Sequence, residues 1–390
     1  MGINTNNHYD VIVSGVGSMG AAACYYLAQK NIKVLGIDQF DIPHEQGSHA
    51  GQSRIIRKAY FENPDYIPLL KRAYENWKRL ESQSGAKIYY QTGLLYHGKP
   101  DHPIISGTKD SAALYDIELD PLDARETKSR FPQFRIPNDF ISFIEPDAGF
   151  VTAERSVLTY KSESLKMGAT IKTNEKVIEW KKGPDGFKLT TDKDIYFCRK
   201  LIITAGAWAG KLIPELKVDL RVTRQTLAWI KPKDESSFTL GNFPCWLVAP
   251  NDKGGIYYGF PILPLSEFGG PVGLKIAHHY PHATADPDNV DRNITAHDEE
   301  EIRGILRDYF TMTDIEIAGW KTCLYTNTRD EDFIIDFLPG YDKDVAIACG
   351  FSGHGFKFVS VVGEILADLA AEGKTDMPID FLRLDRDRLK

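Results

Sequence analysis

A glycine-rich turn near the N-terminus constrains the possible fold more than any other part of the chain. Residues 9–38 read YDVIVSGVGSMGAAACYYLAQKNIKVLGID, in which Gly15, Gly17 and Gly20 form a G-x-G-x-x-G pattern. The β-branched run before the glycines predicts a buried parallel strand, and the segment after them predicts a helix. In such a unit the first glycine permits the tight turn, the second admits a pyrophosphate, and the third packs the helix on the strand.

The acidic residue and the helix start complete a predicted dinucleotide site. Asp38 ends the second expected strand, at the spacing of a carboxylate that binds a ribose 2′-OH. The helix that opens with Ser18 and Met19 directs its positive N-terminal end at the phosphates. The alternative is a glycine-rich turn in an α/β protein without a ligand. The motif alone does not separate FAD from NAD.

Composition excludes several classes of protein. With 390 residues, 42% of them hydrophobic and 26% charged, the chain suits one large or two ordinary globular domains. Its net charge of −7 argues against a nucleic-acid surface, and no apolar run is long enough to cross a bilayer. The first ten residues lack the apolar core of a secretory signal. Five scattered cysteines without C-x-x-C spacing predict neither structural zinc nor a disulfide framework, and favour a reducing, cytoplasmic setting.

Hydrophobic periodicity predicts further elements that extend the first unit into a larger α/β fold. We expect helices over residues 64–82, 153–167, 299–310 and 359–371, and strands over 88–98, 169–173, 176–181, 186–191, 195–198, 201–204 and 345–349. The strand that ends at Thr204 breaks into Ala205-Gly206-Ala207-Trp208, and such a break at the end of a parallel strand is where ligands bind in these sheets.

Two charged segments outside the glycine motif are candidates for anion recognition. Arg54 and Arg57 lie three residues apart, so in a helical turn they would share one face, either as solvated side chains or as an anion site. The C-terminal strand runs into GFSGHGFKF and then a helix, which repeats the strand–loop–helix logic of the N-terminus. Such a loop stabilises negative charge, for example on a reduced flavin ring, and Lys357 within it either binds an anionic substrate or is solvated.

Taken together, several segments resemble the monomeric sarcosine oxidase and N-methyltryptophan oxidase family of FAD-dependent amine oxidases. The segments are VIVSGVGSMGAAACYYL, GSHAGQSRIIRKAY, IYYGFP, GLKIAHH, CLYTNTRDEDFIID and GFSGHGFKF. The resemblance implies a Rossmann-like FAD-binding domain of the glutathione-reductase/D-amino-acid-oxidase type, within a mixed α/β fold. It also implies a second domain on a mixed, largely antiparallel sheet. We expect residues 1–85, 150–215 and 320–390 in the FAD domain, and 86–149 and 216–319 in the substrate domain.

The family likeness also implies how the cofactor is held. FAD would be attached covalently through a cysteine thioether to the flavin 8α-methyl carbon, and the matching residue is Cys323 in KTCLYTNT. By spacing alone this cysteine is a buried small hydrophobe. The residues expected to contact the cofactor are Gly15, Gly17, Ser18, Met19, Gly20, Asp38, Ser48, Arg54, Cys323, Gly353, His354, Gly355 and Lys357.

The substrate side of the site is likewise implied by the family. Arg57 and Lys357 match the pair that holds the substrate carboxylate, one as a fork and one as a point charge. Lys275 matches the lysine beside the flavin where O2 is reduced, since a fixed cation there stabilises developing negative charge.

Other matching residues surround the substrate amine and the flavin. His279 matches an active-site histidine, with His278 as the nearby alternative, and Tyr258 and Tyr325 match active-site tyrosines. Arg54 matches an arginine close to the flavin. Without the family likeness, the histidines and tyrosines read as ordinary packed residues.

The implied reaction is the oxidation of a secondary, N-methyl amino acid. Hydride passes from the N-alkyl carbon to flavin N5, the imine hydrolyses to an aldehyde and a primary amine, and O2 is reduced to H2O2 without a metal. Alternatives are an oxidase of a cyclic imino acid, a fructosyl amino acid or a bulkier N-alkyl amino acid, and a flavin dehydrogenase with another acceptor. A non-catalytic flavoprotein and an NAD-dependent dehydrogenase fit the pattern less well. The likeness favours a monomer that meets only its small-molecule substrate and O2.

The chain departs from the family pattern at two places. Both departures bear on the identity of the substrate more than on the type of reaction. The family often reads GSHHG where this chain has Ala50 in GSHAG, which removes an imidazole near the flavin. The segment ILPLSEFGGPV between Tyr258 and Lys275 is a few residues longer than expected, and we expect it to reshape the mouth of the pocket.

Overall fold

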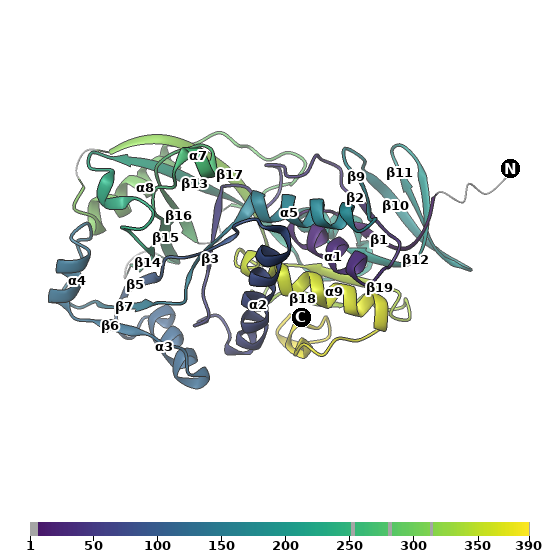
Figure 1. The fold of residues 1–390 in the computed structure, drawn as a ribbon, viewed down its shortest axis with the longest axis horizontal. Coiled ribbons are helices and arrows are strands. Elements are labelled where there is room, and N and C mark those ends of the chain that lie inside the picture. The colour runs from purple at the N-terminus through teal and green to yellow at the C-terminus, as the bar shows by residue number, and fades with distance from the viewer. Residues whose placement is uncertain (1–6, 251–253, 280–282, 313–314, 390) are drawn as a thin grey trace.

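Two large β-sheets lie at opposite ends of the longest axis of the molecule (Figure 1). The structure is a computed structural model, and it describes residues 7–250, 254–279, 283–312 and 315–389. The first six residues, on which part of the signal-sequence argument depends, lie outside the described residues. No helix in the described part of the chain is both long and apolar enough to cross a membrane.

The first sheet is built around the strand of the glycine motif. In this sheet β1 (His8–Ser14) pairs in parallel with β2 on one side and β12 on the other. The remaining strands are β2 (Val34–Ile37), β9 (Thr170–Lys172), β10 (Val177–Gly183), β11 (Gly186–Thr191), β12 (Ile195–Ile203), β18 (Ile334–Phe337) and β19 (Val345–Cys349). The expected βαβ unit and the C-terminal strand are therefore confirmed.

One expectation for this sheet is wrong. The two strands expected over 195–198 and 201–204 form the single strand β12. The charged pair Arg199-Lys200 suggests a break, but Lys200 is paired with Val11 in the ladder. β12 stays continuous because β11 pairs with its first half and β19 with its second half.

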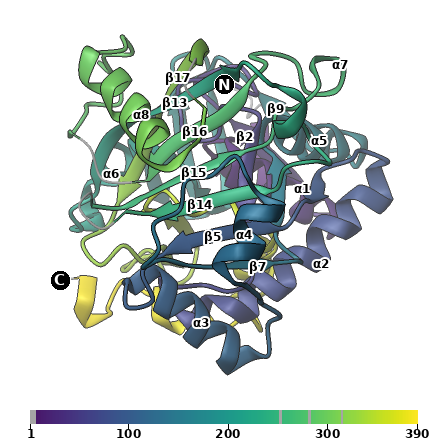
Figure 2. The same cartoon turned by 90° about the vertical axis from the view of Figure 1, so that its left-hand side faces the viewer.

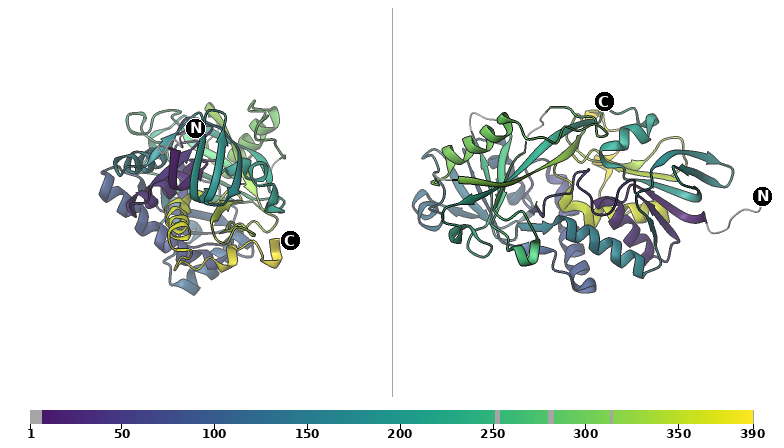
Figure 3. Two further views of the ribbon diagram at one scale, coloured as in Figure 1. Left: turned by 90° about the vertical axis from the view of Figure 1, so that its right-hand side faces the viewer. Right: turned by 90° about the horizontal axis from the view of Figure 1, so that it is seen from above.

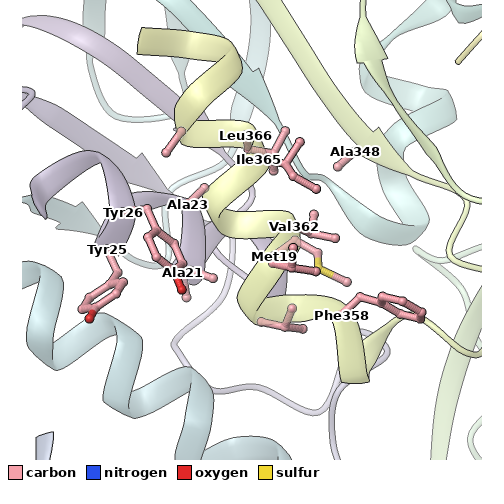
Figure 4. Packing of buried hydrophobic residues seen from close by; sticks show 14 of the residues in the cluster. Met19, Ala21, Ala23, Tyr25, Tyr26, Ala348, Phe358, Val362, Ile365 and Leu366 are labelled. Carbon is pink, nitrogen blue, oxygen red and sulfur yellow. The ribbon is translucent and has the colours of Figure 1, made fainter. Parts of the chain in front are cut away.

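Four helices pack around the first sheet, and their apolar faces form its main core. They are α1 (Ser18–Gln29), α2 (Ile67–Ser84), α5 (Ala153–Lys166) and α9 (Val359–Glu372). Figure 4 shows α9 against α1, with Val362 beside Met19, and with Ile365 and Leu366 on the side of α9 toward Ala348. A Cβ on Gly363 would lie 2.4 Å from the Cβ of Ala22, so only glycine permits this close approach of the two helices. Seen from above, the purple and yellow ends of the chain share one half of the molecule (Figure 3).

The second sheet has the order β17-β13-β16-β15-β14-β5-β7-β6 and is antiparallel except for the pair β14–β5. Figure 2 turns this end of the molecule toward the viewer. Its strands are β5 (Leu94–Gly98), β6 (Asp120–Leu122), β7 (Ile141–Glu145), β13 (Arg221–Pro232), β14 (Cys245–Ala249), β15 (Ile256–Phe260), β16 (Leu274–His279) and β17 (Ile315–Asn327). The expected fold class, with a mixed and largely antiparallel second sheet, is confirmed. Because β17 pairs with β13, residues 320–327 lie in this sheet, and the expected domain boundaries stay a prediction.

A small third sheet connects the two halves. It contains β3 (Ser53–Ile56), β8 (Gly149–Thr152) and β4 (Tyr89–Gln91). The strand expected over 88–98 is divided between β4 and β5, because Gly93 adopts a left-handed conformation with φ of 73°. The shorter helices are α3 (Pro103–Tyr115), α4 (Ala124–Arg130), α6 (Ala209–Leu212), α7 (Leu265–Phe268) and α8 (Ala296–Tyr309). The sequence signalled neither α3 nor α4.

The two faces of the second sheet have different neighbours. Helix α8 covers one face, where Ile302, Ile305 and Leu306 pack against Ala228 and Ile276 of the sheet. Successive residues of a strand point to opposite faces, so the residues that flank these positions point to the other face. That second face carries the candidate catalytic residues.

Candidate active site

A cavity of about 450 Å³ lies where the glycine motif meets the C-terminal loop. The break Ala205-Gly206-Ala207-Trp208 lines it, as the sequence predicts for the end of a parallel strand. The expected site residues on its wall are Gly15, Gly17, Ser18, Met19, Asp38, Ser48, Arg54, Tyr325, Gly353 and Gly355. Segments more than 300 residues apart in the sequence therefore form one binding surface.

The glycine motif has the shape of a phosphate cradle. Gly15 adopts φ of +94°, and a Cβ on Gly20 would lie 1.9 Å from the carbonyl oxygen of Gly15. A Cβ on Gly17, by contrast, would meet no atom within 4 Å. Gly15 and Gly20 thus permit the turn and the helix packing, whereas Gly17 leaves backbone open to the cavity. This arrangement fits a pyrophosphate at the start of α1.

Asp38 is held at the end of β2 on the wall of the same cavity. Its Oδ2 accepts a hydrogen bond from the Val16 N–H at 2.7 Å, and its Oδ1 accepts one from the Phe40 N–H at 2.9 Å. Burial raises the pKa of Asp38 to about 6, although both hydrogen bonds lower it. A carboxylate fixed in this way is suited to accept a hydrogen bond from a ribose hydroxyl.

One face of the second sheet gathers the residues expected to surround the substrate. In the ladders Phe260 of β15 is opposite Lys275 of β16, and Tyr258 is opposite Ala277. Because side chains alternate along a strand, Tyr258, Lys275 and His279 share a face. Pairing of β13 with both β16 and β17 places Cys323 and Tyr325 on this face as well.

The structure separates the two neighbouring histidines of β16. His279 Nδ1 lies 3.1 Å from the Tyr325 hydroxyl, and Tyr325 is also hydrogen-bonded to Tyr258. His278 points to the opposite face, where its Nδ1 lies 2.7 Å from Glu301 of α8. Burial lowers the pKa of His279 to about 4, so its imidazole is neutral at pH 7. His279, not His278, therefore belongs to the tyrosine cluster.

Lys275 is a buried lysine enclosed by backbone oxygens and aromatic rings. Its Nζ donates to the carbonyl oxygens of Gly51 and Ser53, both at 2.6 Å, and lies 4.3 Å from the centre of the Phe260 ring. Its side chain is 2% exposed. Burial, and after it the charge of Arg54, lowers the pKa of Lys275 well below its usual value.

Arg57 and Lys357 lie close together, as expected for a carboxylate-binding pair. Both are buried, and both lie over the ring of Tyr60, at 4.3 Å and 5.1 Å from its centre. Lys357 Nζ donates to the His354 carbonyl at 2.7 Å. Burial lowers the pKa of Lys357 to about 7, and the charge of Arg57 acts in the same direction.

A carboxylate that the sequence did not single out already pairs with Arg57. Glu62 accepts hydrogen bonds from Arg57 Nη2 at 2.6 Å with each of its carboxylate oxygens. Burial opposes its ionisation, but Arg57, His354 and Lys357 hold the pKa of Glu62 at about 2. Glu62 follows Arg57 by five residues, a spacing that predicts no contact, so no sequence signal pointed to it.

Cys323 is a buried free thiol between cations. Burial raises its pKa, whereas Arg54, Lys275 and Arg292 lower it. Its neighbours Leu324 and Tyr325 line the 450 Å³ cavity. Eight of the expected site residues are absent from the wall of this cavity, as far as the described residues extend: Gly20, Arg57, Tyr258, Lys275, His279, Cys323, His354 and Lys357.

Arg54 and His354 take part in the structure of the loops around the cavity. Arg54 donates to the carbonyl oxygens of Ser48, Ala50 and Ser53 at 3.0, 2.6 and 2.9 Å. His354 Nδ1 lies 2.5 Å from the Tyr60 hydroxyl. Within the described part of the chain, no group of three or more His, Cys, Asp or Glu residues is arranged to hold a metal ion.

The segment ILPLSEFGGPV between β15 and β16 lies beside a second cavity, not beside the cavity at the glycine motif. Glu267, Phe268 and Gly270 line this second cavity, which has a volume of about 430 Å³. Gln52 connects the segment to the site, since its Nε2 donates to the carbonyls of Gly269 and Pro271 at 3.0 and 3.1 Å. The segment is absent from the lining of the 450 Å³ cavity among the residues described.

Comparison with known proteins identifies the family of this chain. The family model described as "FAD dependent oxidoreductase" matches residues 10–369. The chain is 39% identical to a monomeric sarcosine oxidase from Bacillus sp. (strain NS-129), over 99% of this chain and 98% of that protein. It is 35% identical to N-methyl-L-tryptophan oxidase from Citrobacter koseri, over 94% and 95% of the two chains.

A solved structure has the same fold. The amino acid oxidase NikD, essential for nikkomycin biosynthesis, superposes with a TM-score of 0.84 and 25% identity over 97% of both chains. The glycine cradle and the buried carboxylate fit the cofactor that the matched family binds. The chain belongs to the monomeric sarcosine oxidase and N-methyltryptophan oxidase family of FAD-dependent oxidoreductases.

Proposed function

We propose that this protein oxidises secondary, N-methyl amino acids and transfers the electrons to O2. The observation that carries the proposal is the pair of buried cations, Arg57 and Lys357, over the ring of Tyr60. With Glu62 as a carboxylate beside Arg57, this cluster retains an unbalanced positive charge whenever Lys357 is protonated. A site of this kind selects a substrate with a carboxylate.

The same charges act on the substrate amine. An amine gives up a hydrogen from its neighbouring carbon readily only when its nitrogen is unprotonated. Arg57 and Lys357 disfavour a third positive charge close to them, and His279 and Tyr325 are neutral polar groups that can accept or donate a hydrogen bond at the nitrogen. We therefore assign Arg57 and Lys357 to the carboxylate, and Tyr258, His279 and Tyr325 to the amine side.

When bound, FAD supplies a two-electron acceptor for the N-alkyl group and delivers the electrons to O2, which becomes H2O2. The resulting imine hydrolyses to an aldehyde and a primary amine. We assign Lys275 to the O2 side, because a fixed cation stabilises the negative charge that O2 acquires. The residues that we assign to FAD are Gly15, Gly17, Ser18, Met19, Gly20, Asp38, Ser48, Arg54, Cys323, Gly353, His354, Gly355 and Lys357, with Arg54 on the flavin side.

We propose that FAD is attached through the thiol of Cys323. The thiolate is the nucleophilic form of cysteine, and three cations near Cys323 favour that form despite its burial. The family likeness supports a monomer in the cytoplasm, with the small-molecule substrate and O2 as its reaction partners. The same site chemistry also accommodates a cyclic imino acid or a fructosyl amino acid, which the substrate assay below separates.

The first test is the fate of the flavin in acid. We expect the yellow colour to stay with acid-precipitated wild type and to be lost from Cys323→Ala. Cys198→Ala is the matched control, since it removes another buried thiol, from β12. Release of all flavin from wild type would contradict the covalent attachment.

The second test is the H2O2 yield with N-methyl amino acids, proline and fructosyl amino acids. We expect one H2O2 for each N-methyl amino acid consumed. Turnover of proline or a fructosyl amino acid alone would assign the alternative substrate class. Substrate-dependent flavin reduction without H2O2 would indicate a dehydrogenase with another acceptor.

A further inference from the structure

The carboxylate of Glu154 binds a turn whose other side holds the buried Lys275 and the half-buried Arg54. Glu154 lies in the first turn of α5, and its Oε1 and Oε2 accept hydrogen bonds from the N–H groups of Gly51 and Gln52 at 2.6 and 2.9 Å. The Gly51 carbonyl accepts from Lys275 Nζ at 2.6 Å, and the Ala50 carbonyl accepts from Arg54 Nη2 at 2.6 Å.

The N–H groups bound by Glu154 and the carbonyl groups bound by the two basic side chains belong to the same two peptide units. The Gln52 N–H and the Gly51 carbonyl belong to one peptide unit, so that unit lies directly between Glu154 and Lys275. The Gly51 N–H and the Ala50 carbonyl belong to the preceding unit, which lies between Glu154 and Arg54. A hydrogen bond to a carboxylate polarises a peptide group and strengthens its carbonyl as an acceptor.

We propose that Glu154 is the counter-charge of Lys275, acting through the Gly51–Gln52 peptide, and that it keeps Lys275 protonated for the reaction with O2. The inference rests on the proposed function, which places Lys275 on the O2 side. Glu154 touches no reacting atom in this arrangement and is a positioning residue. We call the two peptide units with Glu154, Lys275 and Arg54 the Glu154 relay.

The surroundings of Lys275 explain why such a counter-charge matters. Lys275 is buried among Phe260 and Trp229, a setting that favours the neutral amine. The ionisable groups that act on it are Arg54 of β3, Glu154 of α5, Cys323 of β17 and Cys245 of β14. Arg54 lowers the pKa of Lys275, and Glu154 is the largest influence that raises it.

The position of Glu154 avoids the cost of burying a carboxylate beside the ammonium. Glu154 lines the second cavity, where the other ionisable residues are His44, Glu45, Arg155, Glu267 and Lys321. Its charge is therefore only partly desolvated, and the helix N-terminus also favours it. The peptide relay transmits the charge to a site that the carboxylate itself does not enter.

Several contacts fix the backbone of the turn at Gly51 and Gln52, so that its peptide units stay between Glu154 and the two basic side chains. Gln52 adopts φ of +67°, its carbonyl accepts from the Ala153 N–H at 2.9 Å, and its side-chain Oε1 accepts from Trp229 Nε1 at 2.8 Å. These contacts fix the turn between α5 and the sheet face that carries Lys275. The relay is consequently a built feature of three elements that meet at this point.

The test is Glu154→Gln in the holoenzyme, with reduction by substrate and reoxidation by O2 measured separately in stopped flow. Glutamine keeps the size of the side chain but removes its charge. We expect anaerobic reduction to stay within about twofold, and reoxidation at pH 8 to slow by about tenfold. O2 gains two electrons and two protons in that step. The rate of reoxidation should fall as pH rises through the pKa of Lys275. The midpoint of this pH profile should lie about one pH unit lower in Glu154→Gln than in wild type.

A readout independent of turnover is the titration of Lys275 itself. In holoenzyme containing lysine labelled with ¹³C at Cε, the Lys275 signal is identified by its loss in Lys275→Met. We expect its NMR titration midpoint to move lower in Glu154→Gln and to be partly restored in Glu154→Asp, which keeps the charge. Glu163→Gln is the matched control, because it removes a carboxylate from the same helix, where it pairs with Lys166.

The outcomes separate the relay from the role of Lys275. An unmoved Lys275 midpoint in Glu154→Gln, or equal slowing of both half-reactions without a change in midpoint, overturns the relay. Normal reoxidation in Lys275→Met overturns the O2-side assignment of Lys275 instead, and the NMR midpoint then still decides the relay. If Glu154→Gln does not fold, the same comparisons are made with Glu154→Asp, for which we expect smaller shifts in the same direction.

Discussion

Arg57 donates from a single nitrogen, Nη2, to both carboxylate oxygens of Glu62 at 2.6 Å, in the interior of the molecule. Arg57 Nη1 is also engaged, with the Ala59 carbonyl at 2.6 Å. The arginine assigned to the substrate carboxylate is therefore already paired with a carboxylate of the protein. A bound substrate has to share Arg57 with Glu62 or displace it, and this competition leads to the first prediction.

Glu62→Gln should strengthen the binding of anions. Removal of the competing carboxylate leaves Arg57 and Lys357 without a negative partner, so propionate, which lacks an oxidisable amine, should bind about tenfold more tightly. The dissociation constant is measured from the change in the flavin absorbance spectrum. Weaker binding of propionate to Glu62→Gln than to wild type would mean that Glu62 holds Arg57 in its binding position.

Arg57→Gln should lower the stability of the protein and also weaken substrate binding. The variant leaves the largely buried Glu62 without its arginine partner, which costs about 3–5 kcal/mol in the free energy of unfolding. It also removes the fork that binds the substrate carboxylate, so KM should rise about 100-fold.

The double variant Arg57→Gln/Glu62→Gln provides the control for this prediction. It should regain most of the lost stability, because the carboxylate that pairs with Arg57 is removed together with Arg57, while KM stays high. Thermal unfolding and steady-state kinetics measure the two effects. A double variant with wild-type KM would remove Arg57 from substrate binding.

Anion binding should weaken as pH rises through neutrality. Burial and the charge of Arg57 lower the pKa of Lys357 to about 7. Lys357 is therefore charged below pH 7 and neutral above it, so the attraction for a carboxylate is present on the acid side and lost on the alkaline side. We expect the dissociation constant of propionate to increase between pH 6 and pH 9, a window about one to two units either side of the transition.

Lys357→Met is the comparison for the pH series. Because methionine does not titrate, the dissociation constant of this variant for propionate should be flat across the same pH range, above the wild-type value at pH 6 and close to it at pH 9. If the dissociation constant of propionate changed with pH in Lys357→Met as much as in wild type, the pH dependence would belong to another group.

Gly20→Ala should prevent FAD binding by distorting the cradle. Its Cβ would lie 1.9 Å from the Gly15 carbonyl oxygen, which is backbone and cannot yield without moving the turn. We expect a loss of about 1–3 kcal/mol or more in the free energy of unfolding, together with protein purified without flavin. Gly210→Ala is the control, since a Cβ there meets no atom within 4 Å, and it should retain both stability and flavin.

The elements of the cofactor domain that depend on neighbouring residues could be predicted from the sequence. The turn at Gly15, the start of α1 and the strand Val345–Cys349 depend on glycines and apolar runs within a few residues. Strand β12 was predicted as two separate strands, and its continuity comes from pairing with strands far away in the chain. Helix α3 contains Gly107, which disfavours a helix locally but packs against Phe61.

The sequence by itself determined the dinucleotide cradle, the fold class and the family, because these depend on short glycine spacings and on segments that can be compared directly. Only the tertiary structure decided that His279 and not His278 joins Tyr325, because α8 occupies the face of the sheet to which His278 points. It alone paired Glu62 with Arg57 and placed Glu154 opposite Lys275. Arg57 and Glu62 are five residues apart, a spacing that predicts no contact, and Glu154 reaches Lys275 through backbone groups about 100 residues away in the chain. Neither arrangement leaves a pattern of spacing in the sequence.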